Sequence, residues 1–206
     1  MAEAATSQVG IVNAALARLG STDRLTSIDD NHNSAKRAKA AWRDLRRALL
    51  IRHPFNFAIG RARLNEDATP PAFGWRARFA LPADCVRWLP PAPGDRGYFD
   101  GEREGDFILT NARAPLPCRY IRDVEEVPSW SPGFVMAMTI GLAQWISMGI
   151  TESVGMQDRL DQIADRAIRE AKRVDGLETG RRQRGAAMVH SDWLTARNRP
   201  NFGRYR

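Results

Sequence analysis

The chain has 206 residues and a formal net charge of +7, with 43% hydrophobic and 27% charged residues. This composition is typical of a folded protein with a buried core, and it excludes a wholly disordered or fibrous chain. No stretch reaches the roughly 20 apolar residues of a membrane-spanning helix, and the N-terminal residues lack the features of a secretory signal. We therefore expect a protein that is made in the cytoplasm and is not inserted in a membrane.

Two amphipathic helices are predicted in the first quarter of the chain. Residues 7 to 20 repeat apolar side chains at steps of three and four, with Ser7 or Thr6 as a cap and Gly20 as a stop. Ser34 is predicted to cap a second, longer helix. This helix must end before Pro54, because proline disfavours helical geometry in the preceding residue. One face of this second helix is apolar: Ala38, Trp42, Leu45 and Leu49.

Positive charge is concentrated in two segments. Nine basic residues stand against one acidic residue in 35–63, and seven arginines stand against two acidic residues in 177–206. Such segregation favours oriented association with further copies, with other proteins or with nucleic acid. The basic side chains of the second helix are expected to face solvent, a neighbouring subunit or phosphate. They are Lys36, Lys39, Arg43, Arg46 and Arg47.

Residues 55–130 are interpreted as a β-rich insertion. Prolines and glycines punctuate short runs of β-branched and aromatic residues, which is typical of a small antiparallel β domain. The predicted strands are residues 76–81, 86–89, 97–99, 106–110 and 118–122.

Helical periodicity returns after Ser131, which caps a helix that begins with proline. The helix over 133–149 is almost entirely apolar, which predicts burial on most sides, and a fourth helix over 154–175 keeps a narrow apolar stripe. The sequence thus predicts an α+β protein that is mainly α. Residues 1–54 and 131–176 form its bundle of about four helices.

The last segment, residues 177–206, is predicted to be an extended C-terminal arm without a core of its own. Arginines alternate there with isolated apolar residues, and aromatic and arginine side chains dominate protein-binding hot spots. The alternative is that the aromatic side chains stack on nucleic acid. The residues expected to anchor the arm on a protein are Trp193, Leu194, Arg197, Arg199, Phe202, Arg204 and Tyr205.

No catalytic, metal or cofactor site is predicted. The glycine motifs of nucleotide binding are missing, the three histidines are far apart, and Cys85 and Cys118 lack the paired spacing of a zinc site. An acidic run at a two-residue period is the best cation candidate, but a hairpin tip or the acidic half of a subunit contact explains it better. Glu102 and Asp106 in this run are also the candidates for the carboxylate pair of a glycan hydrolase. The run comprises Asp100, Glu102, Glu104 and Asp106.

Five segments follow one another along the chain: IVNAALARLG at 11–20, IDD at 28–30, HPFNFA at 53–58, FGW at 73–75 and FALPADC at 79–85. In this order they resemble the tail tubular protein A family of tailed bacteriophages, the head-to-tail adaptors that lie beneath the portal. The resemblance covers residues 7–175. The proline-rich stretch at 90–94 departs from it and predicts a stiff connection with its own loop geometry.

The resemblance implies a non-enzymatic virion protein without a cofactor, assembled in the host cytoplasm and placed in the neck of the particle. Twelve copies would form a ring around a channel through which duplex DNA passes without recognition of its sequence. Most of the basic second helix would then face a neighbouring subunit, and only a minority of its arginines would face the channel. The arm would reach the portal protein, and the β domain would face the next tail component, a nozzle or stopper protein. The residues that carry the resemblance are expected in the core: His53, Pro54, Phe55, Phe57, Trp75, Phe79, Leu81 and Pro82.

The charge pattern of the sequence is also consistent with a second function. The basic helix and the arginine-rich arm also suit a small DNA-binding or packaging accessory protein, because arginine and lysine contacts to phosphate supply most of the affinity for duplex DNA.

Overall fold

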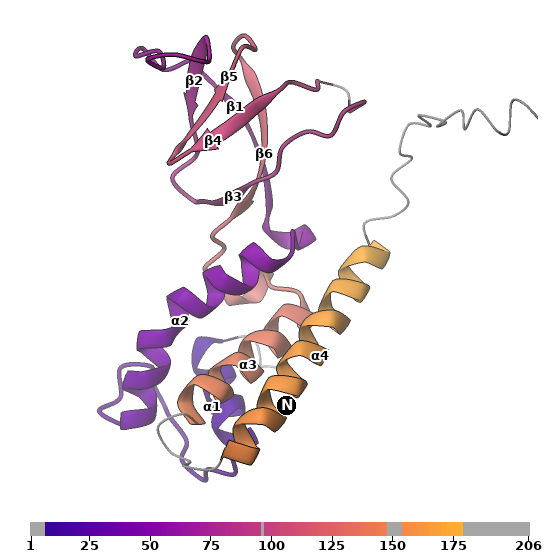
Figure 1. The fold of residues 1–206 in the computed structure, drawn as a ribbon. Helices are drawn as coiled ribbons and strands as arrows, with labels where there is room; N and C mark the ends of the chain where they lie inside the picture. The colour runs from indigo at the N-terminus through magenta and orange to yellow at the C-terminus, as the bar shows by residue number, and fades with distance from the viewer. Residues whose placement is uncertain (1–6, 96, 148–153, 179–206) are drawn as a thin grey trace, which may run out of the picture.

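The computed structural model describes residues 7–95, 97–147 and 154–178, which form a helical bundle with a β domain at one end (Figure 1). In these residues the fold is α+β and mainly α, as predicted. The bundle contains four described helices, α1 (Gln8–Arg18), α2 (Asn33–Arg52), α3 (Pro132–Ser147) and α4 (Val154–Glu178).

Helix α3 is the centre of the bundle, and each of the other three helices packs against it. Its sequence is apolar nearly all round, and ten of its residues are buried, which confirms the predicted burial. Close packing depends on two glycines. A Cβ atom on Gly133 would lie 2.9 Å from the Ala171 Cβ of α4, and one on Gly141 would lie 3.0 Å from Leu45 of α2.

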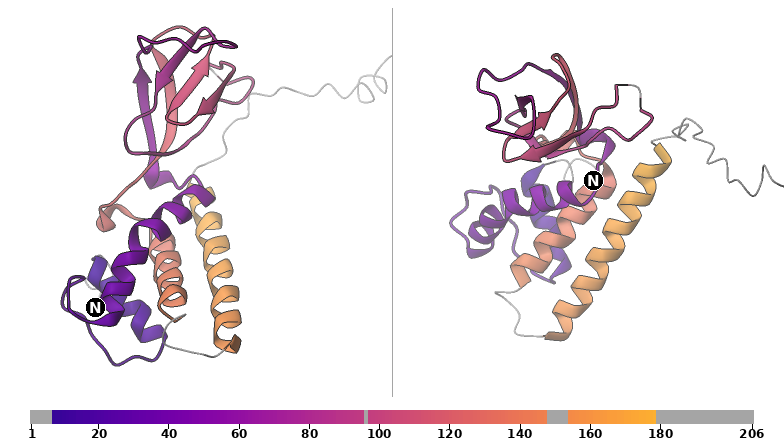
Figure 2. Two further views of the ribbon diagram at one scale, coloured as in Figure 1. Left: turned by 60° about the vertical axis from the view of Figure 1, so that its left-hand side comes forward. Right: turned by 45° about the horizontal axis from the view of Figure 1, so that its top comes forward.

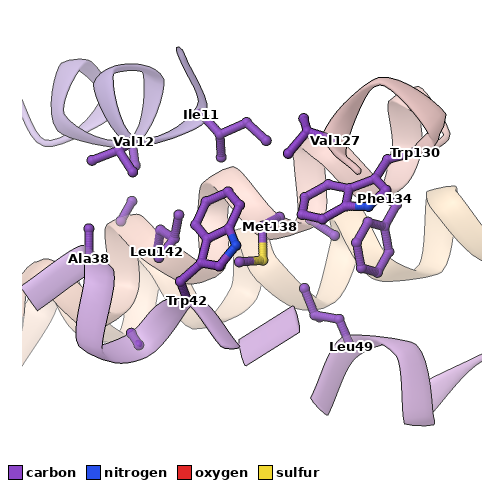
Figure 3. Close-up of a cluster of buried hydrophobic side chains, with 14 of the residues drawn as sticks. Ile11, Val12, Ala38, Trp42, Leu49, Val127, Trp130, Phe134, Met138 and Leu142 are labelled. Carbon is purple, nitrogen blue, oxygen red and sulfur yellow. The ribbon is translucent and has the colours of Figure 1, made fainter. Parts of the chain in front are cut away.

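The core of the bundle gathers aromatic side chains where α2 meets α3 (Figure 3). Trp42 of α2 stacks on Trp130, with ring centroids 5.7 Å apart. Phe134 meets Trp130 edge to face at 5.0 Å, a favoured arrangement of aromatic rings. The indole nitrogen of Trp130 donates to the carbonyl of Val124, so burial leaves this polar atom with a partner.

The helix ends follow the predicted chemistry with one correction. The Ser7 hydroxyl accepts from the Gly10 N–H and caps α1, as predicted. Helix α2 ends at Arg52, in front of His53 with extended backbone geometry, as Pro54 requires. The cap of α2, however, is His32, and not Ser34 as predicted, because Nδ1 of its imidazole accepts from the backbone of Ser34.

The β domain consists of two antiparallel three-stranded sheets, with strand orders β1-β6-β3 and β2-β5-β4. Leu64, Phe79, Ile108 and Leu116 are buried in the core that the two sheets share. The strands are β1 (Ile59–Leu64), β2 (Ala77–Ala80), β3 (Cys85–Trp88), β4 (Gly101–Glu104), β5 (Phe107–Thr110) and β6 (Leu116–Arg122).

The strand predictions were right at β2, β3, β5 and β6 and wrong elsewhere. Residues 97–99 are not a strand, because Gly97 takes a φ of +83° and Phe99 reaches the core by stacking on Trp88 instead. Strands β1 and β4 were not predicted. Strand β4 pairs with β5 around a two-residue turn whose first residue, Gly105, has a φ of +55°, which a type II′ hairpin requires.

The two parts of the molecule meet where α2 ends (Figure 2). Residues 123–130 return from β6 to α3, and Val124, Val127 and Trp130 pack into the bundle core. The end of the predicted insertion, 55–130, therefore packs with the helices.

Candidate functional site

The basic side chains of α2 divide into exposed and buried ones. Lys36, Lys39 and Arg43 are exposed, and Lys39 forms an ion pair of 2.5 Å with Asp29. Arg47 is half-buried, and its guanidinium lies 3.4 Å from a carboxylate oxygen of Asp123.

Arg46 corrects the prediction of a uniformly outward-facing basic helix. Its side chain is 4% exposed, and its Nε donates to Asp123 at 2.8 Å while Nη2 donates to Glu125 at 2.6 Å. Burial by itself would lower the pKa of Arg46, but the hydrogen bonds to the two carboxylates raise this pKa above its usual value. Arg46 thus joins α2 to the segment that follows β6, and its guanidinium is engaged within its own chain.

The residues around the end of α2 form the junction between the bundle and the β domain. Phe55 is fully buried, and both Phe55 and Phe57 meet Phe134 of α3 edge to face, at 5.2 and 5.1 Å. His53 and Pro54 are half-buried. The expected core position is therefore right for Phe55 and only partial for its three neighbours in the motif.

A buried carboxylate closes this junction. Asp175 of α4 is 5% exposed, and one of its oxygens lies 3.0 Å from Nε2 of His53. Its other oxygen accepts the backbone N–H of Asn56 at 2.8 Å, and the side chain of Asn56 donates to the backbone carbonyl of Asp175. The end of α4 is thereby fastened to the chain that enters the β domain.

The motif residues of the β domain have different roles. Phe79 is fully buried in the sheet core, as predicted, and Leu81 and Pro82 are half-buried beside it. Trp75 does not continue this buried face, which corrects the prediction. Trp75 is half-buried, and its indole N–H donates to the carboxylate of Glu102 on β4.

The acidic run lies along the β4–β5 hairpin. Glu102 is engaged by Trp75, and Asp106 lies in the turn, where its backbone carbonyl accepts the N–H of Leu81. Within the described ranges no group of three or more acidic, histidine or cysteine side chains is arranged to hold a metal ion. The hairpin interpretation of this run is confirmed.

Sequence reasoning missed a basic cavity on the outer face of β1 and β6. Arg61 and Arg63 project from alternate positions of β1, and Arg61 pairs across the sheet with Arg119 of β6. They line a cavity of about 730 Å³ together with Pro90 and Pro91 of the proline-rich connection. We call this the arginine cavity. Its signal in the sequence was the alternation of arginine with small or apolar residues in Ile59–Leu64.

Three further predictions concern the cysteines, membrane-spanning helices and the C-terminal arm. Cys85 and Cys118 are free thiols, and burial raises the pKa of Cys118 to about 12. No helix in the described part of the chain is both long and apolar enough to span a membrane. All seven anchor residues predicted for the C-terminal arm, Trp193, Leu194, Arg197, Arg199, Phe202, Arg204 and Tyr205, lie outside the described residues.

The comparisons with known proteins identify no family for the chain. No protein-family model matches the chain, and no curated protein matches it at a significant level.

Proposed function

We propose that the chain is a structural virion protein, a head-to-tail adaptor that docks beneath the portal of a tailed bacteriophage and forms part of its DNA channel. The observation that carries this proposal is the junction of the two parts of the molecule. The motif at 53–58, which contributes to the family resemblance, provides the residues that fasten α2, α3 and α4 to the start of the β domain. The motif therefore has a mechanical role, which an adaptor requires.

A connector must hold partners at its two ends in a fixed relation. Here Arg46, Phe55 and Asp175 make independent contacts across the junction, by an ion pair, by aromatic packing and by hydrogen bonds. Buried polar groups that are fully paired favour one arrangement over others. This construction supports a rigid link. In the proposal the β domain faces the next tail component, and the arm reaches the portal. The predicted start of the arm at residue 177 is corrected, because α4 continues to Glu178.

The channel role limits how tightly the protein can hold DNA. Each neutralised phosphate adds salt-dependent affinity, which would retard a moving duplex. In the proposed ring of twelve copies, most of the exposed basic side chains of α2 therefore face neighbouring protein. Arg46 is already engaged within its own chain, and Lys39 is paired with Asp29.

The proposal is tested by co-expressing the chain with the portal protein of the same phage genome and counting the rotational symmetry of the complex by electron microscopy. A twelvefold ring bound to the portal is expected. A different symmetry would contradict the family assignment. A chain truncated after Glu178 should keep its folded spectrum and lose portal binding, whereas retained binding would contradict the role of the arm.

A DNA-binding accessory protein is the second candidate, and one observation favours it. Lys36 and Arg43 are exposed on one face of α2 and form no ion pair within the described residues. A gel shift titrated with salt separates the two functions. Sub-micromolar binding of duplex DNA with a steep salt dependence would favour the accessory protein, and weak binding together with assembly on the portal favours the adaptor.

A further inference from the structure

The arginine cavity has the size and chemistry of a binding site for an apolar group with negative charge beside it. Its volume of about 730 Å³ lies in the range of binding pockets that enclose a ligand. Arg61 and Arg63 supply positive charge and form no ion pair within the described residues. Pro90 and Pro91 add a stiff apolar wall. Asp95, the acidic residue at this cavity, already accepts the N–H of Ala92.

The other sheet carries a surface of the opposite character. Residues 70–75, which we call the aromatic loop, project Phe73 with 88% of its surface exposed. The loop is held in place on both sides, because the Thr69 N–H donates to Asp67 and the Trp75 indole donates to Glu102. Glu104 of β4 lines the same groove and forms no ion pair in the described part of the chain.

An exposed phenyl ring on a fixed loop costs little to order on binding and buries a large apolar area. The aromatic loop therefore combines an apolar projection with a free carboxylate, and the arginine cavity combines an apolar wall with free guanidinium groups. The two surfaces are complementary in charge, and each also offers an apolar contact. They lie on opposite sides of the β domain, with the aromatic loop at the upper left in Figure 1 and the connection at 89–95 at its right.

We propose that the aromatic loop of one copy of this chain binds in the arginine cavity of a second copy. Phe73 packs against Pro90 and Pro91, and Glu104 pairs with Arg61 and Arg63 of the neighbour. Because the two surfaces differ and face opposite ways, the contact is head to tail, and repeating it gives a ring or a filament. The inference rests on the proposed function, for which it supplies a subunit contact.

The experiment uses the full chain and two variants, Phe73→Ala on the loop and Arg61→Glu with Arg63→Glu in the cavity. Sedimentation velocity measures association up to the millimolar range. The wild type should form oligomers, and each variant alone should associate about tenfold more weakly or not at all, because truncated hot-spot residues typically have effects of this size. An equal mixture of the variants should form dimers and nothing larger, since only one intact pair of surfaces remains.

Matched controls separate this contact from general effects of the substitutions. Ile51→Ala removes another exposed apolar side chain, and Arg113→Glu reverses a charge in the β domain outside the cavity, so both should assemble as the wild type does. A chain that combines Arg61→Glu, Arg63→Glu and Glu104→Arg should recover part of the lost association, because every contact it makes with another copy of itself uses the reversed pair.

Three results would overturn the inference. They are a wild type that stays monomeric throughout the range, variants that assemble like the wild type, and a cavity variant whose main defect is lost binding of duplex DNA. The adaptor role fails separately, when portal particles never carry the chain. Portal rings that form normally with Phe73→Ala would leave that role intact and would reject this contact.

Discussion

At the scale of single residues, Arg46 shows why charge alone does not predict exposure. It lies between Trp42 and Leu49 on a helix whose buried face is otherwise apolar except for Ser34. The sequence alone grouped Arg46 with its exposed basic neighbours. The carboxylates that compensate its burial, Asp123 and Glu125, are 77 and 79 residues away in sequence. No local pattern indicates such a partner, so the expected basic surface was right in part only.

We expect Arg46→Ala to lower the free energy of unfolding by about 3 kcal/mol, because it leaves the carboxylate of Asp123, which is only 12% exposed, without its main partner. Arg47→Ala is the matched control on the next residue. Its contact to Asp123 is longer, at 3.4 Å, and its side chain is 38% exposed, so the loss should be below about 1 kcal/mol. Urea unfolding measures both values, and equal losses would contradict the buried pair.

The Cys118 thiol predicts a decline of stability in alkaline solution. Burial, and then the neighbouring Cys85, raise the pKa of Cys118 from 9.0 to about 12. Between these values the unfolded chain releases the proton and the folded chain keeps it, so stability is complete below pH 9.0 and falls as the pH rises toward about 12. The expected contribution to the slope is about 1.4 kcal/mol per pH unit.

Urea titrations at a series of pH values measure this slope, and Cys118→Ala should reduce it. Burial also raises the pKa of Tyr120, from 10.0 to about 12. Part of the decline in stability above pH 10.0 should therefore remain in the Cys118→Ala variant. A slope that is unchanged in Cys118→Ala would show that the thiol is ionised or exposed in the folded protein.

At the scale of elements, helices were predictable and the strands only in part. A helix is indicated by the period of its apolar residues, by a capping residue and by a residue that ends it. Ser7 and Ser131 cap α1 and α3, and α2 ends in front of Pro54, so these signals lie close to the helices in sequence. Strand β4 has three charged residues and no apolar alternation. It becomes a strand because the turn at Gly105 folds it onto β5, and this pairing cannot be inferred from composition.

Alanine substitutions at two helical glycines are expected to have opposite effects on the stability of the protein. Gly133→Ala should destabilise the protein by about 1–2 kcal/mol, because its Cβ would lie 2.9 Å from the Ala171 Cβ and the two helices would have to separate. Gly176→Ala on α4 should stabilise it by about 0.5 kcal/mol, since a Cβ there meets open space and alanine is the better helix former. Thermal unfolding of both variants is the measurement, and a stabilising Gly133→Ala would reject the close approach of α3 and α4.

At the scale of the whole molecule, the joining of bundle and β domain depends on residues far apart in sequence. The sequence indicated that the motif at 53–58 ends a helix and covers the base of the bundle with aromatic rings. It did not indicate that α4 returns to the same point, because the His53–Asp175 contact spans 122 residues. Such a contact follows from the path of the whole chain.

Asp175→Ala tests whether this contact fastens the two parts. The substitution removes the acceptor of the Asn56 N–H and the partner of His53, and a buried donor left unpaired costs about 1–3 kcal/mol. We expect a loss of about 2 kcal/mol in urea unfolding and faster hydrogen exchange at the Asn56 amide. Asp175→Asn, which keeps an oxygen for that amide, should lose less. Glu170→Ala, an exposed carboxylate on the same helix, should leave the Asn56 amide protected. If exchange at Asn56 is equally slow in all three variants, the end of α4 does not hold the entrance to the β domain.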